Sequence, residues 1–119
     1  MDTAEISTPQ GKIRISDAAL AALARAEALH VPGVAGMDSS LVQGISSMMG
    51  FPENTEGVRV SIKDQCVALS LYIKVRHGIR IPDLALKLQE RVKALVESMT
   101  GLSVSAVNIY VQGVVFEES

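Results

Sequence analysis

The sequence has very few aromatic residues and a single cysteine. Phe, Trp and Tyr make up 3% of its 119 residues, and tryptophan is absent. A core has to be built instead from Val, Ile, Leu, Ala and Met, packed between thin layers. A lone thiol cannot form an internal disulfide, which is typical of a cytosolic protein. We interpret that thiol, Cys66, as a buried structural side chain at the start of a strand.

Strong net charge and long apolar runs are also missing. The 11 basic and 13 acidic side chains give a formal net charge of −2, which offers no general attraction to nucleic acid or to an anionic membrane. No apolar run approaches the ~18 residues that cross a bilayer. The first residues lack the basic and apolar regions of a signal peptide. We therefore expect a soluble, cytoplasmic protein without direct membrane insertion and without nucleic acid as a partner.

Motifs for catalysis or metal binding are not recognisable. His30 and His77 are the only histidines, and neither has Cys, Asp or Glu at the spacing of metal ligands. Nucleophile, Walker and dinucleotide fingerprints are absent, and the acidic residues are scattered singly. We predict no catalytic residue, no cofactor and no bound metal, so the protein is expected not to be an enzyme. An enzyme with unrecognised chemistry stays open as a further alternative.

The most regular segment runs from Ile81 to Gly101 and predicts a long amphipathic helix. Apolar residues recur there at spacings of three and four, charged residues lie opposite, Pro82 suits the first turn and Gly101 is a typical stop. We expect the apolar stripe to lie on a sheet. It comprises Leu84, Leu88, Val92, Leu95, Val96 and Met99.

A second helix is predicted over residues 17–30, with Ser16 as its N-cap and His30 at its end. Its apolar face consists of small residues, so the helix could lie close to a sheet. That face comprises Ala19, Leu20, Leu23, Ala26 and Leu29.

Alternating apolar residues predict strands at residues 12–15, 58–63, 67–75 and 107–111, and a short extended piece follows Pro32. With both helices on one face of a mixed sheet, the predicted fold class is α+β. It is a two-layer sandwich with two amphipathic helices and the order β-α-β-β-β-α-β. The long helix should connect two parallel strands by a crossover.

The chain shows one domain and two less regular stretches. Residues 1–10 are polar and predict a flexible N-terminal tail, and residues 11–119 predict a single domain. Residues 39–56 are irregular but rich in methionine, and they are interpreted either as core cover, which is favoured, or as an interaction surface. Because sheet edges expose backbone groups, we expect self-association through an edge, with this segment alongside. The interaction surface would comprise Leu41, Ile45, Met48, Met49 and Phe51.

Two further stretches have a binding and a structural interpretation. Arg76, His77 and Arg80 gather where a strand meets a helix N-terminus, a geometry that binds anions, although we favour a solvated strand face and loop. Gly33 to Gly36 has the GxxG shape of the loop by which KH domains clamp a nucleic-acid backbone. This stretch contains no Lys or Arg, so a turn is favoured.

Short motifs with a consistent order and spacing run along residues 11–116. They are Gly11-Lys12-Ile13, Val31-Pro32-Gly33-Val34, Gly57-Val58, Gly78-Ile79-Arg80-Ile81, Gln89 with Val92, Met99-Thr100-Gly101-Leu102 and Val107-Asn108-Ile109-Tyr110-Val111. Together they resemble the alkaline shock protein family, also called the envelope stress response family, found mainly in Gram-positive bacteria. His77 departs from the pattern, because members often have Tyr before that Gly.

The resemblance implies a small cytoplasmic protein that is linked to cell-envelope stress and has no catalytic residues. Some members are held at the membrane by a separate anchor protein and self-associate, and others are linked to fatty-acid metabolism. We therefore expect a non-enzymatic adaptor or scaffold that self-associates, with a membrane anchor protein or a lipid-metabolism protein as a further partner. A KH-like RNA-binding module is the alternative.

Overall fold

The computed structural model of the chain describes residues 3–38 and 57–116. The described helices and strands are β1 (Thr3–Thr8), β2 (Gly11–Ser16), α1 (Asp17–Leu29), β3 (Val34–Met37), β4 (Val58–Lys63), β5 (Cys66–Arg76), α3 (Ile81–Thr100) and β6 (Ser103–Val115).

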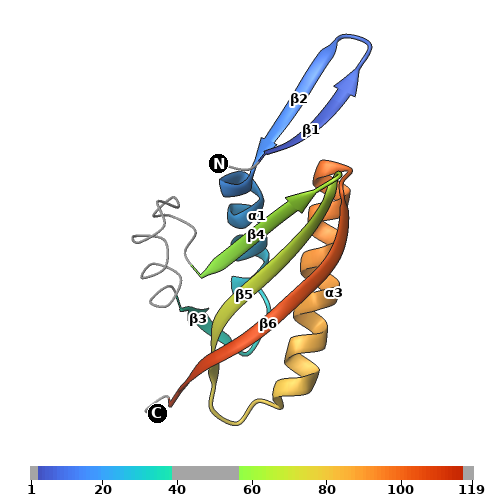
Figure 1. The fold of residues 1–119 in the computed structure, drawn as a ribbon. Coiled ribbons are helices and arrows are strands. Elements are labelled where there is room, and N and C mark those ends of the chain that lie inside the picture. The colour runs from blue at the N-terminus through green and yellow to red at the C-terminus, as the bar shows by residue number, and fades with distance from the viewer. Residues whose placement is uncertain (1–2, 39–56, 117–119) are drawn as a thin grey trace, which may run out of the picture.

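Strand β5 lies at the centre of a four-stranded mixed sheet. Along one edge it pairs with β6 in parallel over its full length. Along the other edge it pairs in antiparallel fashion with β4 over its first half and with β3 near its end. Helices α1 and α3 cover one face of this sheet, and the other face is turned toward the viewer in Figure 1. The predicted two-layer α+β sandwich with a mixed sheet is confirmed.

Strands β3 and β4 form one interrupted edge. The Asp38 N–H donates to the Tyr72 carbonyl, and the Tyr72 N–H donates to the Gly57 carbonyl, both at 2.8 Å. The chain therefore leaves the sheet and returns to it beside the same residue of β5. Only glycine fits at the return point, because φ of Gly57 is 85° and a Cβ there would lie 3.0 Å from the Tyr72 oxygen. The intervening segment 39–56 lies outside the described residues, and so does its predicted interaction surface.

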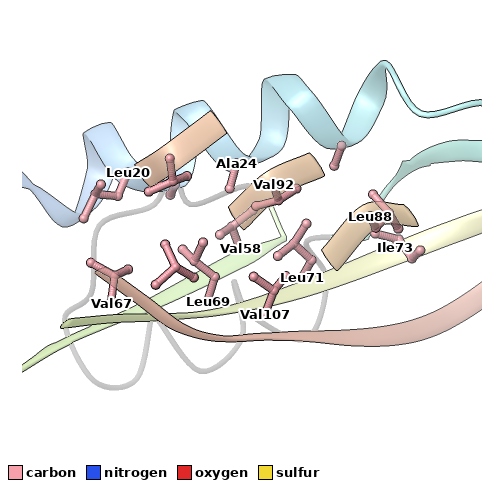
Figure 2. Close-up of a cluster of buried hydrophobic side chains, with 14 of the residues drawn as sticks. Leu20, Ala24, Val58, Val67, Leu69, Leu71, Ile73, Leu88, Val92 and Val107 are labelled. Carbon is pink, nitrogen blue, oxygen red and sulfur yellow. The ribbon is translucent and has the colours of Figure 1, made fainter. Parts of the chain in front are cut away.

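The core lies between the inward side chains of β5 and the helices (Figure 2). Alternate residues of β5, from Val67 to Val75, are fully buried. Four members of the predicted stripe of α3 are buried against them: Leu84, Leu88, Val92 and Val96.

One member of that stripe, Met99, is 61% exposed, so its predicted burial is wrong. The buried positions of α3 recur at a strict spacing of four, which advances the inward line by about 40° per step. The next inward position is therefore Thr100 rather than Met99. Thr100 is half-buried, and its hydroxyl donates to the Val96 carbonyl at 2.6 Å.

Helix α1 begins as predicted but buries a different face. The Ser16 hydroxyl accepts from the Ala19 N–H at 3.1 Å, which confirms the N-cap. The buried residues are Leu20, Ala21, Ala24 and Ala28. Of the predicted face, Leu20 is buried and Leu23 packs against the core, whereas Ala19, Ala26 and Leu29 are exposed. Alanine occurs on every side of this helix, so its pattern does not single out one face.

The N-terminal residues form a strand instead of the predicted flexible tail. Strand β1 pairs with β2 in full register, from Thr3 opposite Ser16 to Thr8 opposite Gly11. Glu5 accepts ion pairs across the hairpin from Lys12 at 3.4 Å and from Arg14 at 3.1 Å. The hairpin projects beyond the end of the helices (Figure 1). Pairing with a partner strand is not visible in the polar local sequence, which explains the error.

Leu88→Ala should destabilise the protein by about 2–5 kcal/mol, because it leaves a cavity between α3 and β5. Urea unfolding followed by circular dichroism measures this loss. Leu86→Ala on the same helix is the matched control, since Leu86 is 56% exposed and its truncation should change stability by less than about 0.5 kcal/mol. Equal effects of the two substitutions would contradict the layer arrangement.

Candidate interaction surface

The three residues of the predicted anion site have different surroundings. Arg76 ends β5 and is exposed. The His77 ring lies 4.6 Å from the Phe116 ring, and Arg80 pairs with Asp83 at 3.3 Å. Within residues 3–38 and 57–116, no printed contact joins the three side chains to one another. An anion site at this position stays a prediction.

The GxxG stretch does not form a free loop. Gly33 lies in the turn before β3, and Gly36 lies within β3 opposite Lys74 of β5. A KH-type clamp requires a loop whose backbone is open to the nucleic acid. Pairing with β5 therefore leaves the turn-and-strand interpretation.

Cys66 is exposed, so its predicted burial is wrong. It begins β5 directly before Val67, whose side chain faces the helices and is fully buried. Since successive side chains of a strand point to opposite faces, Cys66 has to face away from the core.

The described residues contain no group of three or more His, Cys, Asp or Glu side chains that could hold a metal ion. In that same part of the chain, no helix is long and apolar enough to cross a membrane. Attention therefore turns to surfaces, and in particular to the outer edge of β6.

Strand β6 is long and carries no charge. The run from Ser103 to Phe116 contains no Asp, Glu, Lys, Arg or Pro and is rich in Val and Ile. One edge of β6 pairs with β5, and no other described strand pairs with its second edge. Edge strands of soluble proteins usually carry Lys or Pro, because a bare edge is a template for pairing with another chain.

The first half of this second edge is satisfied by side chains of α3. The Glu97 carboxylate accepts from the Val104 N–H at 2.9 Å, and the Gln89 side-chain amide donates to the Val107 carbonyl at 3.0 Å. Both bonds engage backbone groups that point away from β5. The helix thus replaces a neighbouring strand along this half.

The second half of the edge has no such cover within the described residues. Alternation makes the backbone groups of Ile109 and Val111 point the same way as those of Val107. The ladder shifts register between Val111 and Val114. Because the Val115 carbonyl accepts from the His77 N–H, the groups of Val114 point outward again. We call the outward backbone groups of Ile109, Val111 and Val114 the open edge.

Apolar side chains surround the open edge. Val114 is 45% exposed and Phe116 is 69% exposed. On α3, residues four apart share one ridge, so Ile81 lies on the same side of the helix as Gln89, the residue that bonds to β6. Ile81 is also exposed. The sequence signal for this surface was the absence of charge from β6, but an edge position becomes visible only once the strand order is known.

The fold and this surface define the class: a small two-layer α+β domain with one bare sheet edge. The chain belongs to the alkaline shock protein 23 family, described by a cell envelope-related function, whose family model matches residues 5–116. The resemblance found in the sequence is thereby confirmed.

Relatives of similar size occur in Gram-positive bacteria. The uncharacterized protein YloU of Bacillus subtilis (strain 168) is 34% identical over 112 residues, which cover 92% of this chain and 93% of YloU. The uncharacterized protein Spy1614 of Streptococcus pyogenes serotype M6 is 32% identical and covers 94% of each chain. YqhY of B. subtilis is 30% identical over 110 residues, which cover 92% of this chain and 82% of YqhY.

Solved structures show the same fold at low sequence identity. A variant of the MamM CTD has a TM-score of 0.50 at 18% identity, over 80% of this chain and 94% of that chain. At this identity the similarity concerns the fold alone.

Glu97→Ala should destabilise the protein by about 1–3 kcal/mol, because the buried Val104 N–H would lose its acceptor. The measurement is urea unfolding at neutral pH. Glu90→Ala is the matched control, since Glu90 lies exposed on the same helix. If the two substitutions cost the same, α3 does not provide the cover for the first half of the β6 edge.

Proposed function

We propose that the protein is a non-enzymatic, cytoplasmic adaptor of the cell envelope that self-associates through the open edge of β6. Two copies would pair their β6 strands in antiparallel orientation around Val111. The observation that carries the proposal is a long, uncharged strand whose second half exposes backbone groups beside apolar side chains.

The two edges of the sheet differ in a way that supports this pairing. The opposite edge is protected, because β4 carries Arg59 and Lys63 while β3 is four residues long and has a register shift. Charge, short length and irregularity are the usual means of keeping a strand edge single. The β6 edge has none of them beyond Val107.

A second copy of the chain is the occupant that fits best. An antiparallel strand pair has a two-fold axis, so an edge is complementary to itself. The absence of charge between Ser103 and Phe116 means that self-pairing opposes no like charges. The exposed side chains of Val114 and Phe116 would be buried against the partner, which adds a hydrophobic contribution to the backbone hydrogen bonds.

The family resemblance suggests what such an assembly serves. A membrane anchor protein or a protein of lipid metabolism would be the further partner, with the assembled domain as the scaffold. The cell envelope-related description of the family supports this direction. The KH-like alternative loses its main feature, since Gly36 is paired within the sheet.

Val111→Pro should convert the oligomer into a monomer without unfolding it. Proline lacks the N–H that points to the open edge, whereas the pairing with β5 uses the neighbouring residues. Size-exclusion chromatography with light scattering measures the mass, and circular dichroism verifies the fold. A wild-type protein that is monomeric at the highest attainable concentration would overturn self-association.

A charge at the edge tests the same surface without altering the backbone. Val114→Lys should dissociate the oligomer, while Ile13→Lys should not. The two side chains are matched, at 45% and 49% exposed, and Ile13 lies on the β1–β2 hairpin. If both lysine variants keep the wild-type mass, the edge is not the interface. Met48→Asp with Met49→Asp then tests the predicted role of the segment 39–56.

A further inference from the structure

The sheet face that the helices leave open, called the outer face, carries cations and no acid from its strands. Strands β3, β4, β5 and β6 contain no Asp or Glu. Their basic residues are Arg59, Lys63, Lys74 and Arg76, and all four are exposed. They alternate with the inward apolar residues of β4 and β5, so they lie on the outer face.

The acids of the described residues lie elsewhere. The helices carry both signs, for example Glu27 paired with Arg91 at 2.7 Å and Asp83 paired with Arg80. The hairpin balances Glu5 against two cations. The formal net charge of −2 therefore conceals a separation of charge, with the cations of the sheet gathered on one face.

The outer face is extended rather than hollowed. Lys63 pairs opposite Cys66, and Lys74 follows eight residues later on β5, which spaces these two cations by about 26 Å along the sheet. Small residues occupy the centre, such as Ala68, Ser70 and Ala106. Such a surface fits a planar anionic partner better than a small ligand in a pocket.

An exposed aromatic ring lies on the same face. Tyr72 and Tyr110 are opposite each other on β5 and β6, and their rings stack with centroids 4.9 Å apart. Tyr110 remains exposed. Tyrosine is enriched at the headgroup level of bilayers, because its ring is apolar and its hydroxyl is polar.

We propose that the outer face docks on an anionic phospholipid surface, as a peripheral contact. The observations that favour lipid are the row of cations, the extended shape, the exposed tyrosine and the envelope-related description of the family. Two copies of the chain do not fit face to face, since that arrangement would oppose cations to cations.

This inference rests on the proposed self-association for its strength. The two-fold axis of an antiparallel β6 pair is perpendicular to the sheet, so both outer faces lie on the same side of the dimer. Each Lys or Arg near an anionic membrane strengthens binding about fivefold. Pairing doubles the number of cations on one continuous surface and so multiplies the affinity.

The first experiment measures co-sedimentation of the full chain with two kinds of vesicle. One contains phosphatidylcholine alone, and the other contains an equal part of phosphatidylglycerol. We expect binding to the anionic vesicles only, and a steep loss of binding as salt is raised. Equal binding to both kinds, or to neither, would overturn the inference. So would a preference for single-stranded RNA or polyglutamate over the anionic vesicles.

Charge reversal locates the contact. Lys63→Glu with Lys74→Glu should weaken vesicle binding by on the order of a hundredfold or more, because two cations become anions. The matched control is Lys87→Glu with Lys93→Glu on the exposed side of α3, which changes the net charge equally. The control should retain binding within about threefold. A control that binds as poorly as the outer-face variant would mean that net charge alone decides.

The two proposals fail in different ways. Light scattering on the Lys63→Glu, Lys74→Glu variant should show the wild-type mass, since these residues are far from the β6 edge. An oligomeric wild type that ignores anionic vesicles would overturn the lipid contact and leave self-association in place. A monomeric wild type that binds them would overturn self-association and keep the lipid contact. Val111→Pro should bind vesicles at least tenfold more weakly than the wild type.

Discussion

Burial of one face of β5 is the constraint on which the other features depend. Its inward residues from Val67 to Val75 are fully buried, and β5 has pairing partners along both edges. A shift of register by one residue would turn Lys74 and Arg76 into the core, so the register is strongly fixed. The same alternation decides what the outer face presents, including the exposed Cys66 and the stacked tyrosines.

The elements that could be predicted from sequence are those with a clear apolar period. The alternation in β5 and the spacing of four in α3 gave the correct layers, and Ser16 gave the correct start of α1. The buried face of α1 was not predictable, because alanine lies on all of its sides. Strand β1 was missed, because its stability comes from pairing with β2 and from ion pairs to Glu5 rather than from its own pattern.

The candidate surface shows a different limit of sequence reasoning. The lack of charge from Ser103 to Phe116 is visible in the sequence, but it has no meaning until β6 is known to be an edge strand. Likewise, Gln89 and Glu97 read as ordinary polar residues of a helix surface. Their bonds to the backbone of β6 depend on the antiparallel alignment of α3 and β6, which no local pattern encodes.

Charge illustrates why distribution matters more than the total. A net charge of −2 argues against attraction to anionic surfaces only if both signs are mixed on every face. In this fold the strands place all their charged residues on one side and contribute only cations there. Pairing along β6 uses backbone groups in the plane of the sheet, so it leaves the outer face open. Assembly and surface binding therefore do not compete, and each copy that joins the sheet extends the same cationic face.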